Sequence, residues 1–264
     1  MPELPEVETF VRRLQPIVGS RIQKVDVLDD RLNLNGAKLV GATVGSVERR
    51  GKYIVIGLGD RGDLVIHLRM SGRLRMVRSD AETKYTRLTL HLDSGEIVYF
   101  VNPRRLGTAL HCPRGFTTHL GHEPLSPSFT ADVLAEMAAQ SSAPIKTFLL
   151  NQQKIAGIGN IYASETLWRS GIAPDRAAQT LSKDEIRRLH RNIVSVLNDA
   201  LDGQGTTLGN SVSDYHPSVG EQGEFQNHLS VYGRESEPCE RCGAAIARVK
   251  QSGRSTYYCS QCQT

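Results

Sequence analysis

Long apolar runs are what this sequence of 264 residues most clearly lacks. A membrane-spanning helix needs about 20 consecutive apolar residues, and no stretch of the chain approaches that length. Nor does a basic segment followed by an apolar one, the pattern of a secretory signal, precede the first predicted helix. We therefore expect a cytoplasmic protein with no membrane partner. The length is sufficient for two domains.

A strong excess of one charge is also absent, because 32 Lys and Arg against 28 Asp and Glu leave a formal net charge of +4. The arginines are nevertheless clustered. Such clusters are typical of proteins that bind a polyanion, most often nucleic acid, although a solvated surface without a partner explains them equally well. The clusters are Arg49, Arg50 and Lys52; Arg69, Arg73, Arg75 and Arg78; Arg104 and Arg105; and Arg187, Arg188 and Arg191.

Cysteine is scarce except at the C-terminus, where two Cys-x2-Cys pairs are formed by Cys239, Cys242, Cys259 and Cys262. Residues 243–258 separate the pairs, a spacing typical of a zinc ribbon. Four thiolates at this spacing can hold one structural Zn²⁺ in a closed tetrahedral site. Disulfides are rare in the cytosol, so we expect none. We interpret the remaining Cys112 as a buried, inert thiol.

The first half of the chain has the periodicity of strands that follow one helix. Residues 6–14 carry apolar side chains at helical spacing. Of the later segments, 87–92 alternates polar and apolar residues, as a half-exposed antiparallel strand does. These patterns predict a β-sandwich with a helix at its start. The strand-like runs, bounded by Gly and Asp turns, are 53–58, 64–68, 86–92 and 96–101.

The second half has helical patterns. Two prolines within residues 123–128 indicate a linker. Beyond it, Ser182-x-x-Glu185 predicts a capping box ahead of an apolar stripe over 186–201. Residues 146–171 are interpreted as helix, glycine-bearing turn and helix. The N–H groups that begin the second helix can bind a phosphate, but glycine between helices is also an ordinary packing device.

The start of the chain carries the candidate chemistry. Initiator methionine is usually removed before a small residue, and its removal would leave Pro2 with a secondary amine. Part of such an amine is uncharged near neutral pH and can attack an aldehydic carbon to form a Schiff base. Glu3, one peptide bond away, is a candidate for proton transfer. In the alternative interpretation, Pro5 merely occupies the first turn of a helix.

Taken in order, the motifs resemble those of the formamidopyrimidine-DNA glycosylase family over the whole stretch from Pro2 to Gln263. At the first motif, Leu4 resembles the branch that acts on oxidised purines, whereas the endonuclease VIII branch, which prefers oxidised pyrimidines, more often has glycine there. The motifs are Pro-Glu-Leu-Pro-Glu-Val-Glu at 2–8, Arg-Gly-Lys-Tyr at 50–53, His-Leu-Arg-Met-Ser-Gly at 67–72, Asn-Pro-Arg-Arg at 102–105, Gly-Ile-Gly-Asn-Ile-Tyr at 157–162, Val-Tyr-Gly-Arg at 231–234 and the zinc ribbon.

The resemblance implies a bifunctional DNA glycosylase and AP lyase of base excision repair. The Pro2 amine would attack C1′ of a damaged nucleotide that is flipped out of the duplex. Glu3 would protonate the sugar ring oxygen, and β and δ eliminations would then cut the strand. Lys52 resembles the family's catalytic lysine, and Arg254 would act at the phosphate beside the lesion. A solvated surface charge is the alternative interpretation of Lys52.

Contacts with duplex DNA are also implied. His67, Lys146, Asn160 and Arg254 match positions that bind DNA, mostly at phosphates, and the turn of the zinc hairpin would present Arg254. A half-buried strand histidine is the alternative for His67. Side chains that fill the space of the extruded base match Met70, Arg104 and Leu106. The family commonly has phenylalanine where Leu106 stands, and the loop 209–220 departs from the pattern over the extruded base, so opposite-base and lesion preference are open.

The implied fold class is α+β: an N-terminal β-sandwich with a flanking helix, then a helical domain with a helix-two-turn-helix and a β-hairpin zinc ribbon. We expect the domain boundaries at 1–122, 132–236 and 237–264, with a linker over 123–131, and a monomer that binds damaged duplex DNA and one structural Zn²⁺.

Other classes of protein are less consistent with the sequence. A DNA-binding protein without activity would not need Pro2, Glu3 and Lys52. A zinc-ribbon protein of RNA or ribosomes would leave the Pro-Glu start unexplained. Within the family, an endonuclease VIII-like glycosylase for oxidised pyrimidines is the alternative.

Overall fold

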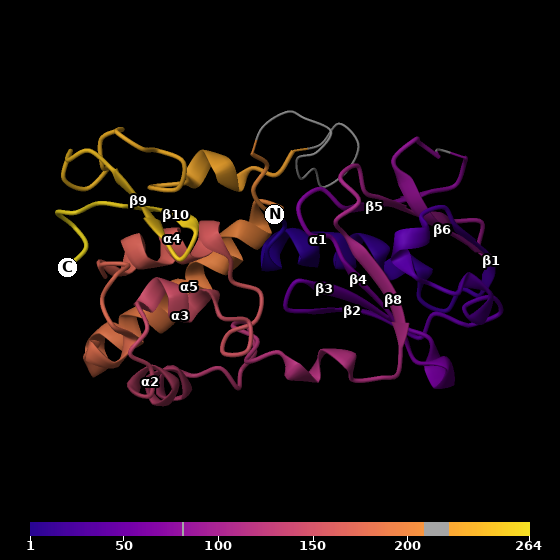
Figure 1. Cartoon of the computed structure of the whole chain (residues 1–264), viewed down its shortest axis with the longest axis horizontal. Coiled ribbons are helices and arrows are strands. Elements are labelled where there is room, and N and C mark those ends of the chain that lie inside the picture. Colours follow the sequence, from indigo (N-terminus) through magenta and orange to yellow (C-terminus); the bar gives the residue numbers. More distant parts are fainter. Residues whose placement is uncertain (81, 209–221) are drawn as a thin grey trace. The chain divides into compact units, whose positions relative to one another are not determined.

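The computed structural model describes residues 1–80, 82–208 and 222–264 (Figure 1). Contacts between residues divide the chain into two units, Met1–Thr118 with Gly203–Gln226, and His119–Asp202 with Asn227–Thr264. The domain boundaries expected from the sequence stay a prediction. Within the described ranges, no helix is both long and apolar enough to cross a membrane.

The first unit begins with helix α1 (Leu4–Leu14), which confirms the predicted amphipathic helix and starts it two residues earlier. Glu3 is the N-cap and Pro5 lies in the first turn, where a missing N–H has no cost. The apolar face of α1 is buried, and the helix packs against strands β2 (Ser46–Arg50) and β3 (Tyr53–Gly57).

Two antiparallel sheets of four strands each form the body of this unit, which confirms the predicted β-sandwich. Strands β1, β2, β5 and β8 were not predicted. The first sheet has the order β1 (Ile22–Val27), β6 (Thr86–Leu92), β7 (Ile97–Val101) and β5 (Arg73–Val77), and the second has the order β2, β3, β4 (Asp63–His67) and β8 (Thr108–Cys112).

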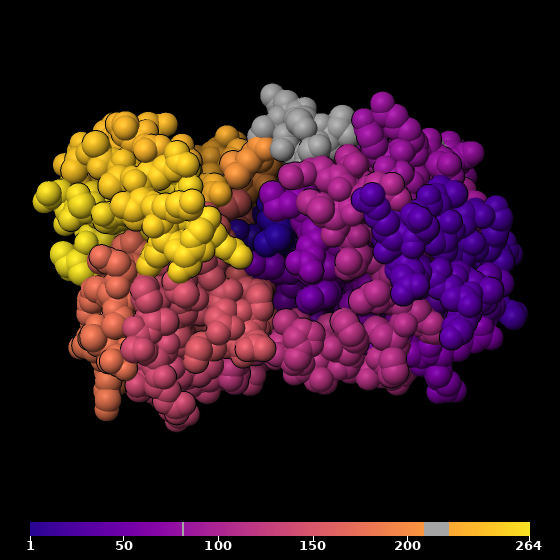
Figure 2. Space-filling model, viewed as in Figure 1, coloured from indigo at the N-terminus to yellow at the C-terminus, as the bar shows by residue number. Residues whose placement is uncertain are grey.

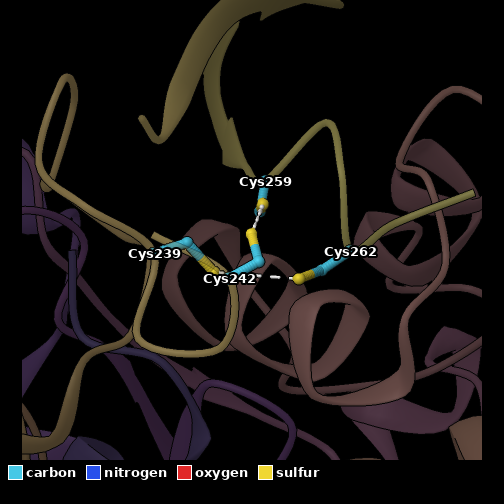
Figure 3. A group of neighbouring side chains, drawn as sticks. All are labelled: Cys239, Cys242, Cys259 and Cys262. Atoms are coloured by element: carbon cyan, nitrogen blue, oxygen red, sulfur yellow. Dashed lines mark hydrogen bonds between the residues drawn. The ribbon is translucent and has the colours of Figure 1, made fainter. Parts of the chain in front are cut away.

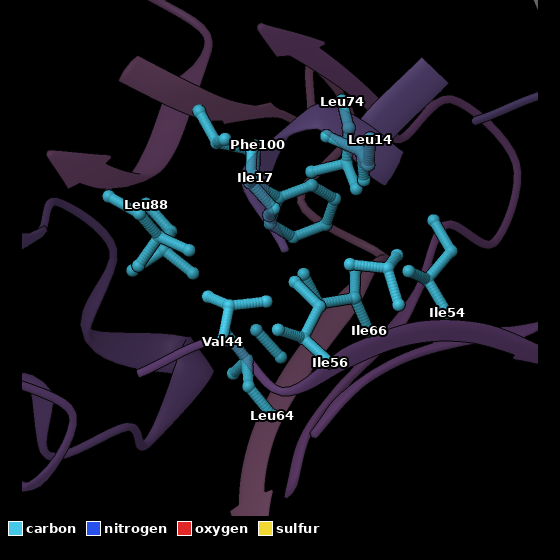
Figure 4. Packing of buried hydrophobic residues seen from close by; sticks show 14 of the residues in the cluster. Leu14, Ile17, Val44, Ile54, Ile56, Leu64, Ile66, Leu74, Leu88 and Phe100 are labelled. Atoms are coloured by element: carbon cyan, nitrogen blue, oxygen red, sulfur yellow. The ribbon is translucent and has the colours of Figure 1, made fainter. Parts of the chain in front are cut away.

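The core of the first unit is the apolar layer between the sheets, where Ile56 and Ile66 of one sheet lie near Phe100 of the other (Figure 4). The alternation predicted for 87–92 is only partly correct, because Thr89 is 1% exposed. Cys112 is half-buried instead of buried, and burial, followed by the charge of Asp63, raises the pKa of its thiol.

The second unit is helical, as predicted. Its helices are α2 (Ala131–Ala139), α3 (Ile145–Leu150), α4 (Asn160–Ser170) and α5 (Lys183–Asp202), and α4 packs along α5. The predicted capping box is confirmed, because the Ser182 N–H donates to Glu185 and the Glu185 N–H donates to the Ser182 hydroxyl. The predicted helix, glycine turn and helix over 146–171 correspond to α3 and α4.

The C-terminal hairpin consists of β9 (Ala247–Gln251) and β10 (Arg254–Tyr258), joined by the two residues Ser252 and Gly253. Both turn residues have positive φ, 48° and 77°, as a tight hairpin turn of this length requires. Short 3-10 helices elsewhere are η1 (Gln15–Ile17), η2 (Asp30–Leu32), η3 (Gly36–Lys38), η4 (Gly59–Arg61), η5 (Phe116–His119), η6 (Ala178–Thr180) and η7 (Phe225–His228).

Candidate functional site

The first residues of the chain are held at the buried end of α1. Pro2 is buried and Glu3 is 3% exposed. The Glu3 N–H donates to Oε2 of Glu6 at 2.7 Å, the reciprocal arrangement of a capping box. The other oxygen of Glu6 accepts the N–H of Thr206 at 2.8 Å. One buried carboxylate therefore joins the backbone beside Pro2 to a segment far along the sequence.

The approach of that segment depends on a glycine. Gly205 has φ +84°, and a Cβ atom there would lie 2.8 Å from Oε1 of Glu6. A side chain would therefore both strain the backbone and displace the carboxylate. No local signal in the sequence indicates that Glu6 meets the segment of Gly205 and Thr206, because the contact spans about two hundred residues.

Lys52 lies in the two-residue turn between β2 and β3, after Gly51 with φ 57°. Its side chain is largely buried, with 5% of the residue exposed. Lysine is rarely buried unless its ammonium has a partner, because burial removes the charge from water. The placement of Lys52 therefore disfavours the alternative of a solvated surface charge.

His67 is the last residue of β4 and stands opposite Tyr53 in the sheet, with the two rings edge to face at 4.6 Å. Burial, followed by the charges of Arg69 and Lys52, lowers the pKa of His67 to about 3. The imidazole is therefore neutral at physiological pH. Its Nδ1 atom lies 3.0 Å from the backbone nitrogen of Arg69, whose N–H it accepts, and this assigns the single ring proton to Nε2.

The three residues that match the family's void-filling positions project from two neighbouring loops. Met70 is 42% and Leu106 47% exposed, and Arg104 is exposed as well. The loops are joined, because the Arg104 N–H donates to the hydroxyl of the buried Ser71 at 3.3 Å. Large exposed apolar side chains have a hydrophobic cost unless a partner covers them.

Lys146, on α3, is 1% exposed, and its ammonium donates to protein acceptors. Nζ lies 2.6 Å from Oδ1 of Asn160, 3.0 Å from the Ser255 carbonyl and 2.8 Å from the Thr256 hydroxyl. The Asn160 side chain also donates to Ser255 at 2.9 Å. Lys146 therefore joins the start of α4 to strand β10. Its own contact with DNA stays a prediction.

Arg254 is exposed at the first position of β10, directly after the hairpin turn. The turn belongs to the same strand pair that contacts Lys146 and Asn160 through Ser255. An exposed guanidinium on this short hairpin can reach an anion. Asn160, the first residue of α4, lies within the same group of contacts.

Four sulfur atoms converge at the base of the hairpin (Figure 3). The Sγ atoms of Cys239, Cys242, Cys259 and Cys262 all lie within 4.8 Å of one another. The pairs Cys239–Cys262 and Cys242–Cys259 are separated by 3.9 Å and 3.5 Å. Tetrahedral Zn²⁺ with Zn–S bonds of about 2.3 Å places its sulfurs about 3.8 Å apart. The four thiols therefore fit a structural zinc ion.

The ribbon is docked on α4. Arg241 donates to the last carbonyls of that helix, those of Trp168 at 2.9 Å and Arg169 at 3.1 Å, and its guanidinium lies 4.0 Å from the Trp168 ring. Trp168 packs in one apolar cluster with Cys239 and Cys259. In Figure 2 the yellow C-terminal residues form part of the visible surface of this unit.

The loop 209–220, whose pattern departs from the family, lies outside the described residues. The remaining residues of interest fall into two groups. Pro2, Glu3, Lys52, His67 and the three void-filling candidates lie in the first unit, whereas Lys146, Asn160, Arg254 and the four cysteines lie in the second.

These features define a class of protein that combines a β-sandwich, with a buried proline at the second residue of the chain, with a helical unit ending in a four-cysteine hairpin. Three family models match the chain. The N-terminal domain of formamidopyrimidine-DNA glycosylase matches residues 1–109, its H2TH domain matches 120–211, and a zinc finger found in FPG and IleRS matches 236–264.

Curated relatives match over nearly the full length. The formamidopyrimidine-DNA glycosylase of Lactiplantibacillus plantarum is 39% identical, over 98% of both chains. That of Roseiflexus is 42% identical over 100% of both. The chain therefore belongs to the formamidopyrimidine-DNA glycosylase family.

Solved structures of Fpg proteins have the same fold as this chain. The crystal structure of the MutM (Fpg) protein from Thermus thermophilus superposes with a TM-score of 0.88 at 39% identity, over 99% of this chain and 98% of that one. The Lactococcus lactis Fpg in complex with a Fapy-dG containing DNA gives a TM-score of 0.87 at 33% identity, over 99% and 100%.

Proposed function

We propose that this chain is a bifunctional DNA glycosylase and AP lyase that removes oxidised purines, such as 8-oxoguanine and formamidopyrimidines, from duplex DNA. The observation that carries the proposal is the buried position of Pro2 and Glu3 at the start of α1, in a chain of this family. The Lactococcus lactis relative in complex with Fapy-dG containing DNA supports the same substrate class.

The chemistry begins after Met1 is removed, because with Met1 attached the nitrogen of Pro2 is an amide. The lone pair of the Pro2 amine attacks C1′ of the damaged nucleotide. The C1′–N bond to the base breaks, its electron pair leaves with the base, and the base takes up the proton that the Pro2 nitrogen loses. Glu3 protonates the sugar ring oxygen, the ring opens, and the nitrogen of Pro2 and C1′ are joined as an iminium.

Strand cleavage follows from that iminium. It acidifies the hydrogens on C2′, and loss of one as a proton expels the 3′ phosphate in a β elimination. A further proton loss expels the 5′ phosphate in a δ elimination. Water then hydrolyses the iminium and returns the free Pro2 amine. Glu3 accepts and returns protons during these steps.

The neighbouring residues hold the lesion strand. The buried Lys52 cation would lie near the lesion phosphate, where low dielectric strengthens its attraction. The neutral His67 would donate from Nε2 to a phosphate and orient it without adding charge. Asn160 and Arg254 would bind flanking phosphates, Arg254 with a charge-assisted bond.

The exposed side chains of Met70, Arg104 and Leu106 would enter the space that the extruded base leaves. Proteins that bend DNA often insert apolar wedges between base steps. Leucine loses the base stacking that an aromatic ring provides, which is worth roughly 1–3 kcal/mol per base. Opposite-base preference is therefore the property in which we expect this chain to differ from relatives with phenylalanine.

The zinc ribbon has a structural role in this proposal. Cys239, Cys242, Cys259 and Cys262 would hold one Zn²⁺, and the folded hairpin would present Arg254. The protein would act as a cytoplasmic monomer on duplex DNA.

Borohydride trapping tests the nucleophile. Incubation with a duplex that contains 8-oxoguanine, in the presence of borohydride, should yield a covalent adduct whose peptide mass maps to Pro2. A variant with a retained N-terminal extension is the matched control and should give no adduct. If the extended protein traps as well as the processed one, a lysine is the nucleophile and the mechanism is wrong.

A substrate panel tests the class of lesion. Duplexes with 8-oxoguanine or a formamidopyrimidine should be cut faster than one with thymine glycol, and a preformed abasic site should be cut as well. Preferential excision of thymine glycol would assign the chain to the endonuclease VIII-like alternative.

A further inference from the structure

Arg105 is unusual because it stands between two exposed candidate wedge residues, Arg104 and Leu106, in a left-handed backbone conformation. Its φ is +52°. Residues other than glycine avoid this region because Cβ approaches the backbone too closely, so contacts elsewhere must hold it there. The residues on either side of this strained position, Arg104 and Leu106, are both exposed.

The side chain of Arg105 supplies such contacts. Its Nε donates to Oδ2 of Asp29 at 2.7 Å, and Nη2 donates to Oδ1 of the same carboxylate. This two-pronged geometry fixes the guanidinium in orientation as well as distance. Asp29 is 2% exposed, and Arg105 holds its pKa at about 2, so the carboxylate is ionised under all physiological conditions. The same guanidinium also contacts Asp30, whose side chain is 93% exposed.

The backbone of the loop is fixed from both sides of Arg105. The N–H of Arg105 donates to the Asn102 carbonyl at 3.2 Å, and the Arg87 side chain donates to that same carbonyl at 3.3 Å. The N–H of Arg104 donates to the Ser71 hydroxyl, in the loop that carries Met70. The ion pair to Asp29 therefore completes a set of contacts around the loop 102–107.

We propose that Asp29 is a positioning residue for base extrusion: by holding Arg105 in its left-handed conformation, it directs Arg104 and Leu106 into the space of the extruded base. The inference rests on the proposed function and extends it to a residue outside every motif of the sequence. A leucine wedge gains little from stacking, so its placement depends on the rigidity of the loop that carries it.

Two isosteric variants, Asp29→Asn and Asp30→Asn, form a matched pair because both carboxylates contact the same guanidinium. Asp29→Asn should lower kcat/KM for excision of 8-oxoguanine about tenfold or more, as expected when a group is misplaced by a fraction of an ångström. It should change cleavage of a preformed abasic site by about twofold at most, because such a nucleotide needs little help to leave the stack. Asp30→Asn should match the wild type on both substrates.

The ratio of excision opposite cytosine to excision opposite adenine gives a readout that folding alone does not move. Asp29→Asn should shift this ratio, and Asp30→Asn should not. Equal losses on lesion and abasic duplexes, with an unchanged ratio, would show that Asp29 serves only stability and would overturn the proposal.

Arg105→Gly separates the backbone conformation from the ion pair. Glycine adopts φ +52° without strain but has no side chain for Asp29 to hold. If the ion pair fixes the loop, Arg105→Gly should behave as Asp29→Asn does, and Arg105→Lys should recover part of the loss. Wild-type activity of Arg105→Gly would overturn the proposal.

Hydrogen exchange in the free protein keeps this test independent of the proposed function. The amides of Arg104 and Arg105 should exchange faster in Asp29→Asn than in Asp30→Asn, because the loop opens more often. Unchanged exchange would refute the positioning role even in an active enzyme. A wild type that cuts no lesion duplex would refute the proposed function, whatever the exchange shows.

Discussion

His67 and Lys52 of the first unit and Lys146 of the second are held in place by different physical means. In the first unit an apolar layer between two sheets supports residues at strand ends and turns, as His67 and Lys52 show. In the second unit the decisive contacts are buried polar ones. Lys146 donates to three acceptors, and Glu165 accepts the N–H groups of Ser230, Val231 and Tyr232 at 2.8–3.0 Å.

Both units contain buried titratable groups. Burial raises the pKa of Glu165, although its three N–H donors favour the ionised form. In the first unit, burial and nearby cations leave His67 without charge. Lys146 is buried among hydrogen-bond acceptors that satisfy its ammonium. Under the proposed function, the first unit would supply the chemistry and the second would bind the backbone of the DNA strand.

Glu3→Gln should have the largest effect and tests the chemical role of the first unit. Excision of intact damaged nucleotides should fall by several orders of magnitude, because it requires protonation of the ring oxygen. Cleavage of a preformed abasic site should be largely spared, because the base has already left. Parallel single-turnover assays on the two duplexes would measure this. Equal loss on both substrates would assign Glu3 to capping of α1 or to activation of the amine.

Paired variants of the zinc hairpin test the structural role of the second unit. Cys259→Ser should lose the metal and lower the melting temperature, because thiolate coordination contributes folding energy directly. Arg254→Ala should leave the melting temperature almost unchanged but lower the salt slope of log affinity by about one unit, as expected for one lost phosphate contact. Both variants should bind DNA more weakly.

Salt titration of binding to a duplex with an abasic-site analogue measures the Arg254→Ala effect, and calorimetry with metal analysis measures Cys259→Ser. An unchanged slope and affinity in Arg254→Ala would mean that the hairpin does not touch DNA. This result would contradict the proposal that the hairpin of the second unit binds the DNA backbone.

The smallest effect concerns the neutral state of His67. The unfolded chain binds a proton at this residue below about pH 6.5, whereas the folded chain binds it only near pH 3. The wild type should therefore lose stability as pH falls, by about 2 kcal/mol between pH 7 and pH 5 relative to His67→Gln. Urea unfolding at the two pH values measures the difference. A constant difference would mean that folding does not lower the pKa of His67, and the neutral imidazole would not be a property of the fold.

Local signals predicted a large part of the structure. The Cys-x2-Cys spacing predicted the four-sulfur cluster, and the capping box at Ser182 predicted the start of α5, because each depends on residues close in sequence. Strand β5 was not predicted because its sequence Arg-Leu-Arg-Met-Val, in which arginine alternates with apolar residues, was assigned to a basic cluster. Alternation, not charge, was the informative feature there.

Polar contacts between residues far apart in the sequence could not be predicted. Lysine is usually exposed, so the sequence gives no reason to expect that Lys146 is buried. Its acceptors Ser255 and Thr256 lie on β10, more than a hundred residues later in the chain. Asp29 and Arg105 are likewise 76 residues apart, and neither lies in a pattern that indicates the other. Propensity and periodicity describe neighbours in sequence, so such pairs require coordinates.

The contact between Glu6 and Thr206 has a consequence for biosynthesis. The first unit includes residues 203–226 as well as 1–118, so it is not complete when residue 118 leaves the ribosome. The carboxylate that braces the start of α1 finds its distant partner only after residue 206 has been translated. Domains generally fold in the order of their synthesis. The start of α1, which carries the candidate nucleophile Pro2, is therefore made first and braced late, and a nascent chain that ends before residue 206 lacks this contact.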